Sequence, residues 1–396
     1  MSVSDQEIIS RFPVGYYPLH PDVALNFQMN RFWGWVGEEQ MLEELRAAAP
    51  RIASYADWVR EMLELSDKAL ADGRRLPAAL YSRAAQFFLE PADPRYKPAL
   101  QRFLDNVLAG NGVTADDHQL VPYQQAQLSA YRFTPAQPRG TIVVFGGYDS
   151  YIEEWLPAAL ALRDAGLDTV IFDGPGQGTV LDAGRPMTPD WHLPVAAVLD
   201  YFDLSGITLL GFSLGGCLVL RAAAREPRIS RVVAWDVLTD FFAGATTGLL
   251  GAAGLAAIAA NSGQIPALVL NAAVEATAKA DLMTEWIFRQ GERVTGAATP
   301  ADVLKAWREY RTGDVSPLVT QDVLLMAGTK DHGVPFHMLG DQLLALTAAR
   351  SVSARVFTEA EQAQNHCQIG NQGLAIKVIL EWLDSVGGRI AESAAG

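Results

Sequence analysis

From about Gly112 to the C-terminus, short runs of β-branched and aromatic residues alternate with longer helical patterns. Seven runs predict strands, at residues 124–133, 141–145, 169–173, 208–211, 232–235, 323–327 and 354–357. Five helical patterns lie between or after them, at residues 153–165, 191–202, 214–225, 336–348 and 372–386. Several strand runs are continuous in Val, Ile and Leu, as expected when both faces of a sheet are covered. This alternation predicts βαβ units and a mainly parallel central sheet, and therefore an α/β fold.

The region before about residue 120 follows a different pattern. Apolar residues recur there at three- and four-residue spacing, which predicts helices at residues 38–49, 52–71, 77–89 and 98–108. Its aromatic residues can form a packing layer or wall a pocket, and they are Trp33, Trp35, Trp58, Tyr81, Phe87 and Phe88. A second helical stretch, at about residues 241–310, interrupts the later alternation. We therefore expect an N-terminal helical region at 1–120 and a core at 121–396, with a helical lid insertion at about 237–318.

The segment Gly211-Phe212-Ser213-Leu214-Gly215 lies between a predicted strand and a predicted helix. A G-x-S-x-G sequence in that context is typical of a nucleophile elbow, a sharp turn that lifts the serine hydroxyl above the carboxyl edge of the sheet. Side chains at the flanking glycines would collide with neighbouring backbone. The N-terminus of the following helix presents N–H groups to a developing oxyanion. Ser213 is therefore the predicted nucleophile.

A serine needs a general base to act as a nucleophile. In this architecture the acid and then the histidine follow the serine along the chain, which leaves His332, His337 and His366 as candidates. We predict His366, because it lies in a loop between the last predicted strand and the C-terminal helix and can reach back over the sheet. Asp331 follows the strand at 323–327 and is expected to orient the imidazole. Its alternative role is to cap the next helix.

The loop after the strand at 141–145 begins with a pair of glycines, followed by Tyr148 and Asp149. Paired glycines let the backbone approach a bound carbonyl, so the N–H groups of Tyr148 and Leu214 are the predicted oxyanion-hole donors. An ordinary strand-exit turn is the alternative for this loop. Gly147 and Asp149 are expected to contact substrate, and so is Asp240, which lies beyond the strand at 232–235.

Three further features of the sequence are expected to have structural rather than catalytic roles. Asp236 is interpreted as a helix or turn cap, and Cys367 as a small packing residue beside His366. The stretch Asp-Gly-Pro-Gly-Gln-Gly at 173–178 lacks the Gly-Lys-Ser/Thr ending of a phosphate loop, so it is interpreted as a turn after a strand.

Composition narrows the classes of function. The chain has 31 basic and 45 acidic residues, and its net charge of −14 disfavours binding to nucleic acids and to anionic membrane surfaces. Two cysteines cannot build a disulfide framework or a zinc cluster, and the N-terminus has no secretory pattern, so a cytoplasmic location is expected. Residues 241–274 carry no charge, but they are rich in Ala and Gly and are interrupted by Asn261 and Pro266. That composition favours a buried or pocket-lining helical hairpin over a membrane span.

Together, Ser213, Asp331, His366 and the paired glycines resemble the serine α/β-hydrolase superfamily. Segments at 80–85, 146–154, 173–178 and 225–228 are also similar to one subgroup that has a long N-terminal helical region. That subgroup includes 2,6-dihydroxypseudooxynicotine hydrolase and fungal hydrolases that shorten polyketide chains. The resemblance implies an α/β-hydrolase fold and cleavage of carbon–carbon bonds in β-dicarbonyl-type substrates, although other members are esterases or acyl-transfer enzymes. The lid departs from the subgroup in its richness in Ala and Gly.

We therefore expect a serine hydrolase that cleaves an ester-like or carbon–carbon bond of an apolar or aromatic small molecule, with no metal or organic cofactor. An acyltransferase that uses the same acyl-enzyme chemistry and a non-catalytic ligand-binding homologue are the alternatives. The natural substrate is left open, and so is a homodimer. Bulky substitutions at Ala256 or Ala259 in the lid are expected to change substrate choice more than stability.

Overall fold

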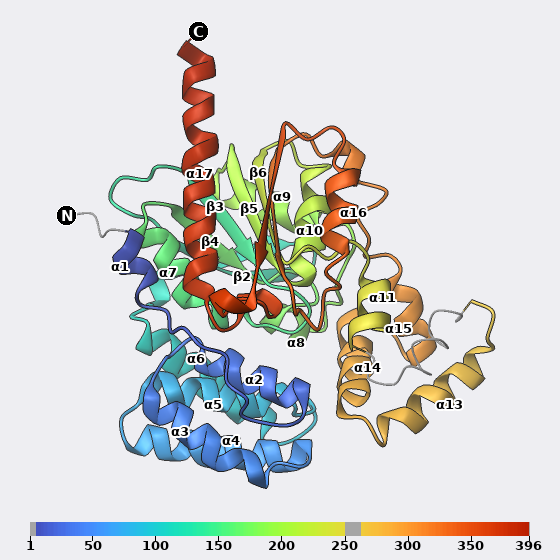
Figure 1. Cartoon of the computed structure of the whole chain (residues 1–396). Coiled ribbons are helices and arrows are strands. Elements are labelled where there is room, and N and C mark those ends of the chain that lie inside the picture. The colour runs from blue at the N-terminus through green and yellow to red at the C-terminus, as the bar shows by residue number, and fades with distance from the viewer. Residues whose placement is uncertain (1–4, 250–262, 396) are drawn as a thin grey trace.

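The computed structural model describes residues 5–249 and 263–395, and a sheet of eight strands forms its centre (Figure 1). The strand order is β1-β2-β4-β3-β5-β6-β7-β8. The strands are β1 (His118–Tyr123), β2 (Ala126–Phe133), β3 (Thr141–Phe145), β4 (Asp168–Phe172), β5 (Ile207–Phe212), β6 (Ile229–Trp235), β7 (Asp322–Gly328) and β8 (Ser351–Phe357). The β1–β2 and β2–β4 pairs are antiparallel, and every other neighbouring pair is parallel. The prediction of a mainly parallel sheet in an α/β fold is confirmed.

Helices cover both faces of this sheet. Figure 1 shows α7 (Leu156–Asp164) and α17 (Gln372–Ala395) on one face, and α9 (His192–Phe202) and α10 (Leu214–Ala223) on the other. Residues of β4, β5 and β7 are buried along their whole length. The burial explains the continuous apolar runs in the sequence, because neither face of these strands meets water. Two further helices of the core are α8 (Gly178–Asp182) and α16 (Met338–Ala345).

The antiparallel edge differs from the expectation. A single strand at 124–133 was predicted, whereas the structure has a hairpin in which β1 precedes β2. Gln124, in the connecting turn, has a left-handed φ of 51°. Pro122 weakens the strand pattern of β1, and proline is tolerated here because β1 is an edge strand.

Six α-helices precede the sheet in the described part of the chain, and they are α1 (Asp5–Ile9), α2 (Val23–Trp33), α3 (Glu39–Ala48), α4 (Tyr55–Ala71), α5 (Arg75–Phe87) and α6 (Tyr96–Gly110). The last four of these match the predicted helices. Helix α2 was missed, because every residue from Ala24 to Trp33 is buried, polar and apolar alike. A helix buried all round has no one-sided apolar stripe to reveal it.

The insertion between β6 and β7 is helical, as expected. It contains α11 (Phe241–Gly244), α13 (Ala267–Ala278), α14 (Leu282–Thr295) and α15 (Pro300–Trp307). Ala256 and Ala259 lie outside the described residues. Among the described helices, none combines the length and the apolar composition that a bilayer crossing requires.

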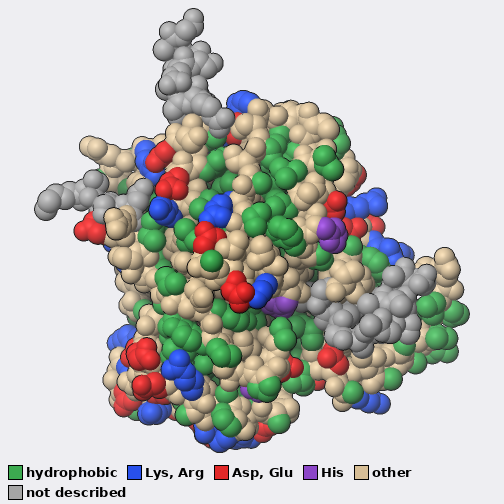
Figure 2. All heavy atoms as spheres, in the orientation of Figure 1, with side chains coloured by type: hydrophobic (Ala, Val, Ile, Leu, Met, Phe, Trp, Pro, Cys, Tyr) green, Lys and Arg blue, Asp and Glu red, His purple; other side chains and the backbone are tan. Residues whose placement is uncertain are grey.

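The insertion touches the N-terminal helices directly. Figure 1 shows both groups of helices beyond the same end of the sheet. The Tyr55 hydroxyl donates to the carbonyl oxygen of Leu282, and Arg289 forms an ion pair with Glu90 at 2.8 Å. The two helical layers therefore meet above one edge of the sheet. On the molecular face in Figure 2, acidic and basic side chains are interspersed rather than gathered by sign.

Candidate active site

Ser213 occupies the turn between β5 and α10 with φ 58° and ψ −121°, a strained conformation for a residue with a side chain. Its N–H donates to the carbonyl oxygen of Trp235 at 2.8 Å, which ties the turn to the neighbouring strand β6. The flanking glycines allow the turn to close. A Cβ on Gly211 would lie 2.3 Å from the carbonyl oxygen of Gly215, and a Cβ on Gly215 would lie 2.8 Å from that of Gly146.

The structure brings the three predicted catalytic residues together. His366 Nε2 lies 2.8 Å from Ser213 Oγ, and His366 Nδ1 lies 2.8 and 2.9 Å from the two carboxylate oxygens of Asp331. Asp331 Oδ1 also accepts hydrogen bonds from the N–H groups of Gly333 and Val334. One nitrogen of the imidazole therefore faces a hydroxyl while the other faces a fixed carboxylate, which is the geometry of a nucleophile, a general base and an orienting acid.

Electrostatics support the same assignment. Burial disfavours ionisation of Asp331, but the charge of His366 and its hydrogen bond outweigh burial and lower the pKa of this carboxyl. Burial also disfavours the imidazolium form of His366. The nearby negative charges, that of Asp331 above all, outweigh burial and raise the pKa of His366 well above its usual value. The pair therefore stabilises the charge that appears on the imidazole when it takes the proton of the serine.

The loop of the predicted oxyanion hole lies against the nucleophile. A Cβ on Gly147 would lie 2.7 Å from the carbonyl oxygen of Phe212 and 3.1 Å from the backbone nitrogen of Leu214, so only glycine permits this approach. The backbone of Tyr148 is anchored by Gln290, whose side-chain amide donates to its carbonyl oxygen at 3.0 Å. Gly147 and Tyr148 both line the pocket beside Ser213.

Asp149 and Asp240 were both predicted to contact substrate, and the structure places them in different surroundings. Asp149 lines the pocket and pairs with Arg31 at 3.2 Å. Asp240 instead caps α11, where its carboxylate accepts from the N–H of Ala243, and it is not among the pocket-lining residues. The first turn of α11 thus uses the side chain of Asp240, and a substrate contact at this residue stays a prediction.

The pocket above Ser213 contains about 910 Å³ of space between protein atoms, part of it open to solvent. One wall comes from the N-terminal helices and the other from the insertion. Aromatic and aliphatic side chains of the two walls are Phe27, Tyr55, Phe87, Phe88, Leu238, Phe241, Met283 and Trp286. Phe87 stacks on Trp286 with ring centroids 5.3 Å apart, so the walls touch. The pocket suits an apolar or aromatic ligand.

Among the aromatic residues singled out in the sequence, Phe87 and Phe88 line this pocket. The other four are buried and pack elsewhere, and they are Trp33, Trp35, Trp58 and Tyr81.

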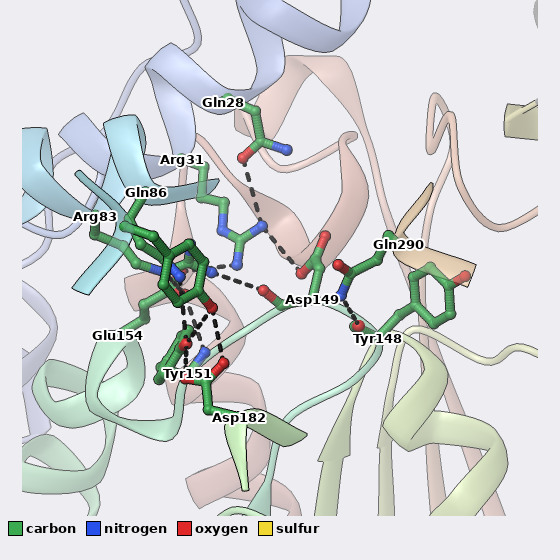
Figure 3. Close-up of polar contacts among 11 residues, drawn as sticks. Gln28, Arg31, Arg83, Gln86, Tyr148, Asp149, Tyr151, Glu154, Asp182 and Gln290 are labelled. Atoms are coloured by element: carbon green, nitrogen blue, oxygen red, sulfur yellow. Dashed lines mark hydrogen bonds and ion pairs between the residues drawn. The ribbon is translucent and has the colours of Figure 1, made fainter. Parts of the chain in front are cut away.

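A cluster of charged residues, most of them buried, lies beside the pocket, and Figure 3 shows its contacts. Glu154 forms two ion pairs. Its Oε2 lies 2.7 Å from a guanidinium nitrogen of Arg31, and its Oε1 lies 2.8 Å from Nε of Arg83. Arg83 also donates to the carbonyl oxygen of Asp149 at 2.7 Å. Because α2 carries Arg31 and α5 carries Arg83, the cluster joins these two N-terminal helices to the loop beside Ser213.

Three residues that lie at the site were given no role in it by the sequence. Asp236, interpreted as a cap, lies 3.1 Å from His366 Nδ1. His332 lines the pocket, where burial and next the charge of His366 lower its pKa to about 4. Arg31 lines the pocket from α2. The signal for Asp236 was its position directly after β6, the strand next to β7, whereas Arg31 belongs to the helix that the pattern did not reveal.

One group of described residues is close enough together to be considered as a metal site. Its possible ligand atoms lie within 4.8 Å of one another and belong to Asp236, His366 and Cys367. Their chemistry does not fit a metal centre. Nδ1 of His366 already faces Asp331, and burial raises the pKa of the Cys367 thiol to about 12, so the thiol stays protonated. These residues fit a hydrogen-bonded network, with Cys367 as a buried packing residue.

Comparison with known families agrees with this fold. Residues 140–341, just over half of the chain, match the family described as alpha/beta hydrolase fold, and the chain belongs to that family.

Relatives and solved structures extend the likeness beyond that segment. The hydrolyase poxO of Penicillium oxalicum is 29% identical over 281 residues, which span 63% of this chain and 64% of the relative. The 20-hydroxy-prefusarin hydrolase FUS2 of Gibberella moniliformis is 29% identical over 369 residues, 84% of this chain and 86% of the relative. A crystal structure of 2,6-dihydroxy-pseudo-oxynicotine hydrolase shares the fold with a TM-score of 0.59 and 21% identity, covering 86% of this chain and 91% of the other. The predicted resemblance is confirmed, and this chain is an α/β hydrolase.

Proposed function

We propose that the protein hydrolyses an ester-like or β-dicarbonyl carbon–carbon bond of an apolar or aromatic small molecule, in secondary metabolism. The observation that carries the proposal is the 2.8 Å contact between His366 Nε2 and Ser213 Oγ at the base of an aromatic pocket. Two similar proteins are named for hydrolysis of 20-hydroxy-prefusarin and of 2,6-dihydroxy-pseudo-oxynicotine, which agrees with an organic small-molecule substrate.

In the proposed reaction, His366 takes the proton of Ser213 as the hydroxyl oxygen attacks the substrate carbonyl carbon. Asp331 holds the imidazole and stabilises its positive charge. The N–H groups of Tyr148 and Leu214 bind the oxyanion, and each such donor contributes about 2.7–4 kcal/mol in comparable sites. The tetrahedral intermediate then expels the leaving group, which receives the proton from His366.

The same residues serve either bond. An ester releases an alcohol, whereas a β-diketone releases an enolate carbon that leaves as a ketone once His366 has protonated it. In both cases water, activated by His366, then attacks the acyl-serine and releases a carboxylic acid and free Ser213. One water is consumed for each bond cleaved, and no oxidant or reductant is needed.

A fluorophosphonate probe tests the nucleophile. We expect labelling of the full-length protein at Ser213, identified by mass spectrometry of the modified peptide, and no labelling of Ser213→Ala. Absence of labelling in the unmodified protein would contradict the proposal and favour a non-catalytic ligand-binding homologue.

Product analysis tests the bond. The protein is incubated with an aryl ester and with an aryl β-diketone, and the acid and ketone products are quantified by liquid chromatography. Acid release from at least one of them, absent in Ser213→Ala, is expected. Formation of an adduct with an added amine or thiol in place of the acid would instead identify an acyltransferase.

A further inference from the structure

Two carboxylates approach the same nitrogen of the proposed general base. Asp331 Oδ2 lies 2.8 Å from His366 Nδ1, and Asp236 Oδ2 lies 3.1 Å from the same atom. Both acids are almost completely buried. They come from the carboxyl ends of β6 and β7, which are paired parallel neighbours, so the sheet itself delivers them to one point. A triad with one acid leaves Asp236 unexplained.

The backbone holds Asp236 in an uncommon conformation. Its φ is 70°, in the left-handed region that residues with side chains seldom adopt. The Asp236 carbonyl also abuts α10, since a Cβ on Gly216 would lie 1.8 Å from its oxygen. Strain of this kind persists only where the surrounding structure enforces it, and it is concentrated at functional sites.

The side chain of Asp236 also holds the loop that carries the base. Its Oδ2 accepts from the N–H of Cys367 at 2.5 Å, and its Oδ1 accepts from the side-chain amide of Gln368 at 3.0 Å. Cys367 and Gln368 both have left-handed φ values, of 50° and 49°. One carboxylate therefore contacts three consecutive residues, and the first of these is His366.

The charges around Asp236 differ from those around Asp331. Burial, and next the charge of Asp331, raise the pKa of Asp236 to about 6, and His366 opposes this rise. Asp331 has the lowered pKa described above and remains the ionised partner. Asp236 also contacts the N–H of Cys367, whose thiol is protonated, and the neutral amide of Gln368. Near neutral pH, Asp236 is thus a second negative charge at the imidazole.

We propose that Asp236 is a second acid of the site, which positions His366 through its loop and can replace Asp331 as the partner of Nδ1. This inference rests on the proposed nucleophile Ser213. It predicts a site that tolerates the loss of either acid better than the loss of both. In a serine protease triad with a single acid, the exchange of aspartate for asparagine lowers kcat about 10⁴-fold.

The test compares Asp331→Asn, Asp236→Asn and the double variant in the full-length protein. The readouts are kcat/KM for an aryl ester and the rate of fluorophosphonate labelling at Ser213. We expect each single variant to lose less than about 10²-fold and the double variant to lose about 10⁴-fold or more. A loss in Asp331→Asn as large as in the double variant would overturn the proposal.

A pH profile separates a charge at the base from a merely structural contact. Removal of the Asp236 charge lowers the pKa of the His366 imidazolium, so the acid limb of kcat/KM moves to lower pH in Asp236→Asn. Asp168→Asn is the matched control, since Asp168 is a buried aspartate that pairs with Arg132 at 2.8 Å and lies at the amino end of β4, away from the carboxyl edge of the sheet that carries Ser213. Its profile should coincide with that of the unmodified protein. An unmoved acid limb in Asp236→Asn would contradict the proposal.

Failure of this inference is distinguishable from failure of the proposed function. If the unmodified protein is not labelled at Ser213, the proposed function itself fails. If it is labelled but Asp236→Asn does not fold, Asp331→Asn alone decides, because a loss near 10⁴-fold in that variant means that Asp236 cannot act as its replacement.

Discussion

Gln177 donates a hydrogen bond from its side-chain amide to the carbonyl oxygen of Gly147 at 3.0 Å, and a second to that of Gly146 at 2.7 Å. The carbonyl of Gly147 and the N–H of Tyr148 belong to one peptide group, in which they point in opposite directions. By holding the carbonyl, Gln177 therefore fixes the direction of the N–H that is proposed to bind the oxyanion. The glycine-rich turn after β4, which carries Gln177, is thereby connected to the site.

The first prediction follows from this contact. In Gln177→Leu the peptide of Gly147 loses its anchor, so the oxyanion donor is no longer preorganised. We expect kcat for an aryl ester to fall about 10–10²-fold with a smaller change in KM, since loss of a whole donor costs about 10²–10³-fold. Steady-state kinetics on the purified variant measure both constants.

The control for Gln177→Leu is Gln342→Leu. Gln342 is also a buried glutamine with two side-chain hydrogen bonds, to Ser316 and Thr312, and it lies on α16. Both variants should have lower melting temperatures, but only Gln177→Leu should lose kcat. An equal loss in both variants would mean that the contact supports the fold alone.

The second prediction concerns the proposed catalytic residues as a unit. Ser213→Ala and His366→Ala should each lower kcat/KM by about 10⁴-fold or more, and the double variant should be little worse than either, because the two residues act in one step. Ser129→Ala, at a buried serine of β2, is the matched control and should retain full activity. Losses that multiply in the double variant would argue against a shared step.

The core of the fold could be predicted because its signals are local. Continuous apolar runs mark β5 and β7, and the short sequence around Ser213 specifies its own turn, because Gly211 and Gly215 must pack closely against each other. Positions at strand ends follow from such runs, which is why Ser213 and Asp331 could be assigned to the same edge of the sheet.

The residues that were missed depend on contacts far apart in the sequence. Asp236 and His366 are 130 residues apart, and nothing beside Asp236 in the sequence distinguishes a cap from a partner of the imidazole. Gln177 lies in a turn whose glycines explain its shape without indicating that its amide reaches the loop before Tyr148. Helix α2 was missed because its polar residues are buried, and Arg31 was missed with it.

The third prediction is a pH dependence of stability at His332. Its folded-state pKa, about 4, lies below the unfolded value of about 6.5, so the unfolded chain binds more protons between these pH values. Titration of His332 therefore lowers the free energy of unfolding as pH falls from about 6.5 to about 4. His332→Phe keeps a ring against Phe27, whose centroid is 4.5 Å away, but it cannot titrate.

Urea unfolding at pH 7 and pH 5 measures this effect. Other groups also titrate in this range, so the comparison is between the two proteins. The drop in the free energy of unfolding from pH 7 to pH 5 should be smaller in His332→Phe than in the unmodified protein. Identical drops would contradict a neutral, enclosed His332.

The fourth prediction concerns the buried charge cluster. In Glu154→Gln, Arg31 and Arg83 lose the carboxylate that both contact, and breaking a buried ion pair costs about 3–5 kcal/mol. Asp67→Asn is the control, because its pair with Arg102 is exposed and should be worth less than about 1 kcal/mol. Urea titrations with linear extrapolation give both values. Equal, small losses would mean that Asp149 alone can compensate the two guanidinium groups.

The last prediction concerns the wall that the insertion contributes to the pocket. Met283, on α14, lines the pocket near Trp286 and is only partly buried against the core, so exchange of its flexible side chain should cost little stability. Met283→Trp adds volume to this wall and leaves Ser213 and His366 untouched. Since the pocket lies between two helical layers, the added ring should obstruct a bulky aryl substrate more than a short acyl one. We expect kcat/KM for a bulky aryl ester to fall at least tenfold further than for an acetyl ester, with little change in melting temperature.

Leu268→Trp is the control, because Leu268 lies on α13 with 80% of its surface exposed. If Met283→Trp lowers activity towards both esters equally, this wall does not select the substrate and α14 is only a cover.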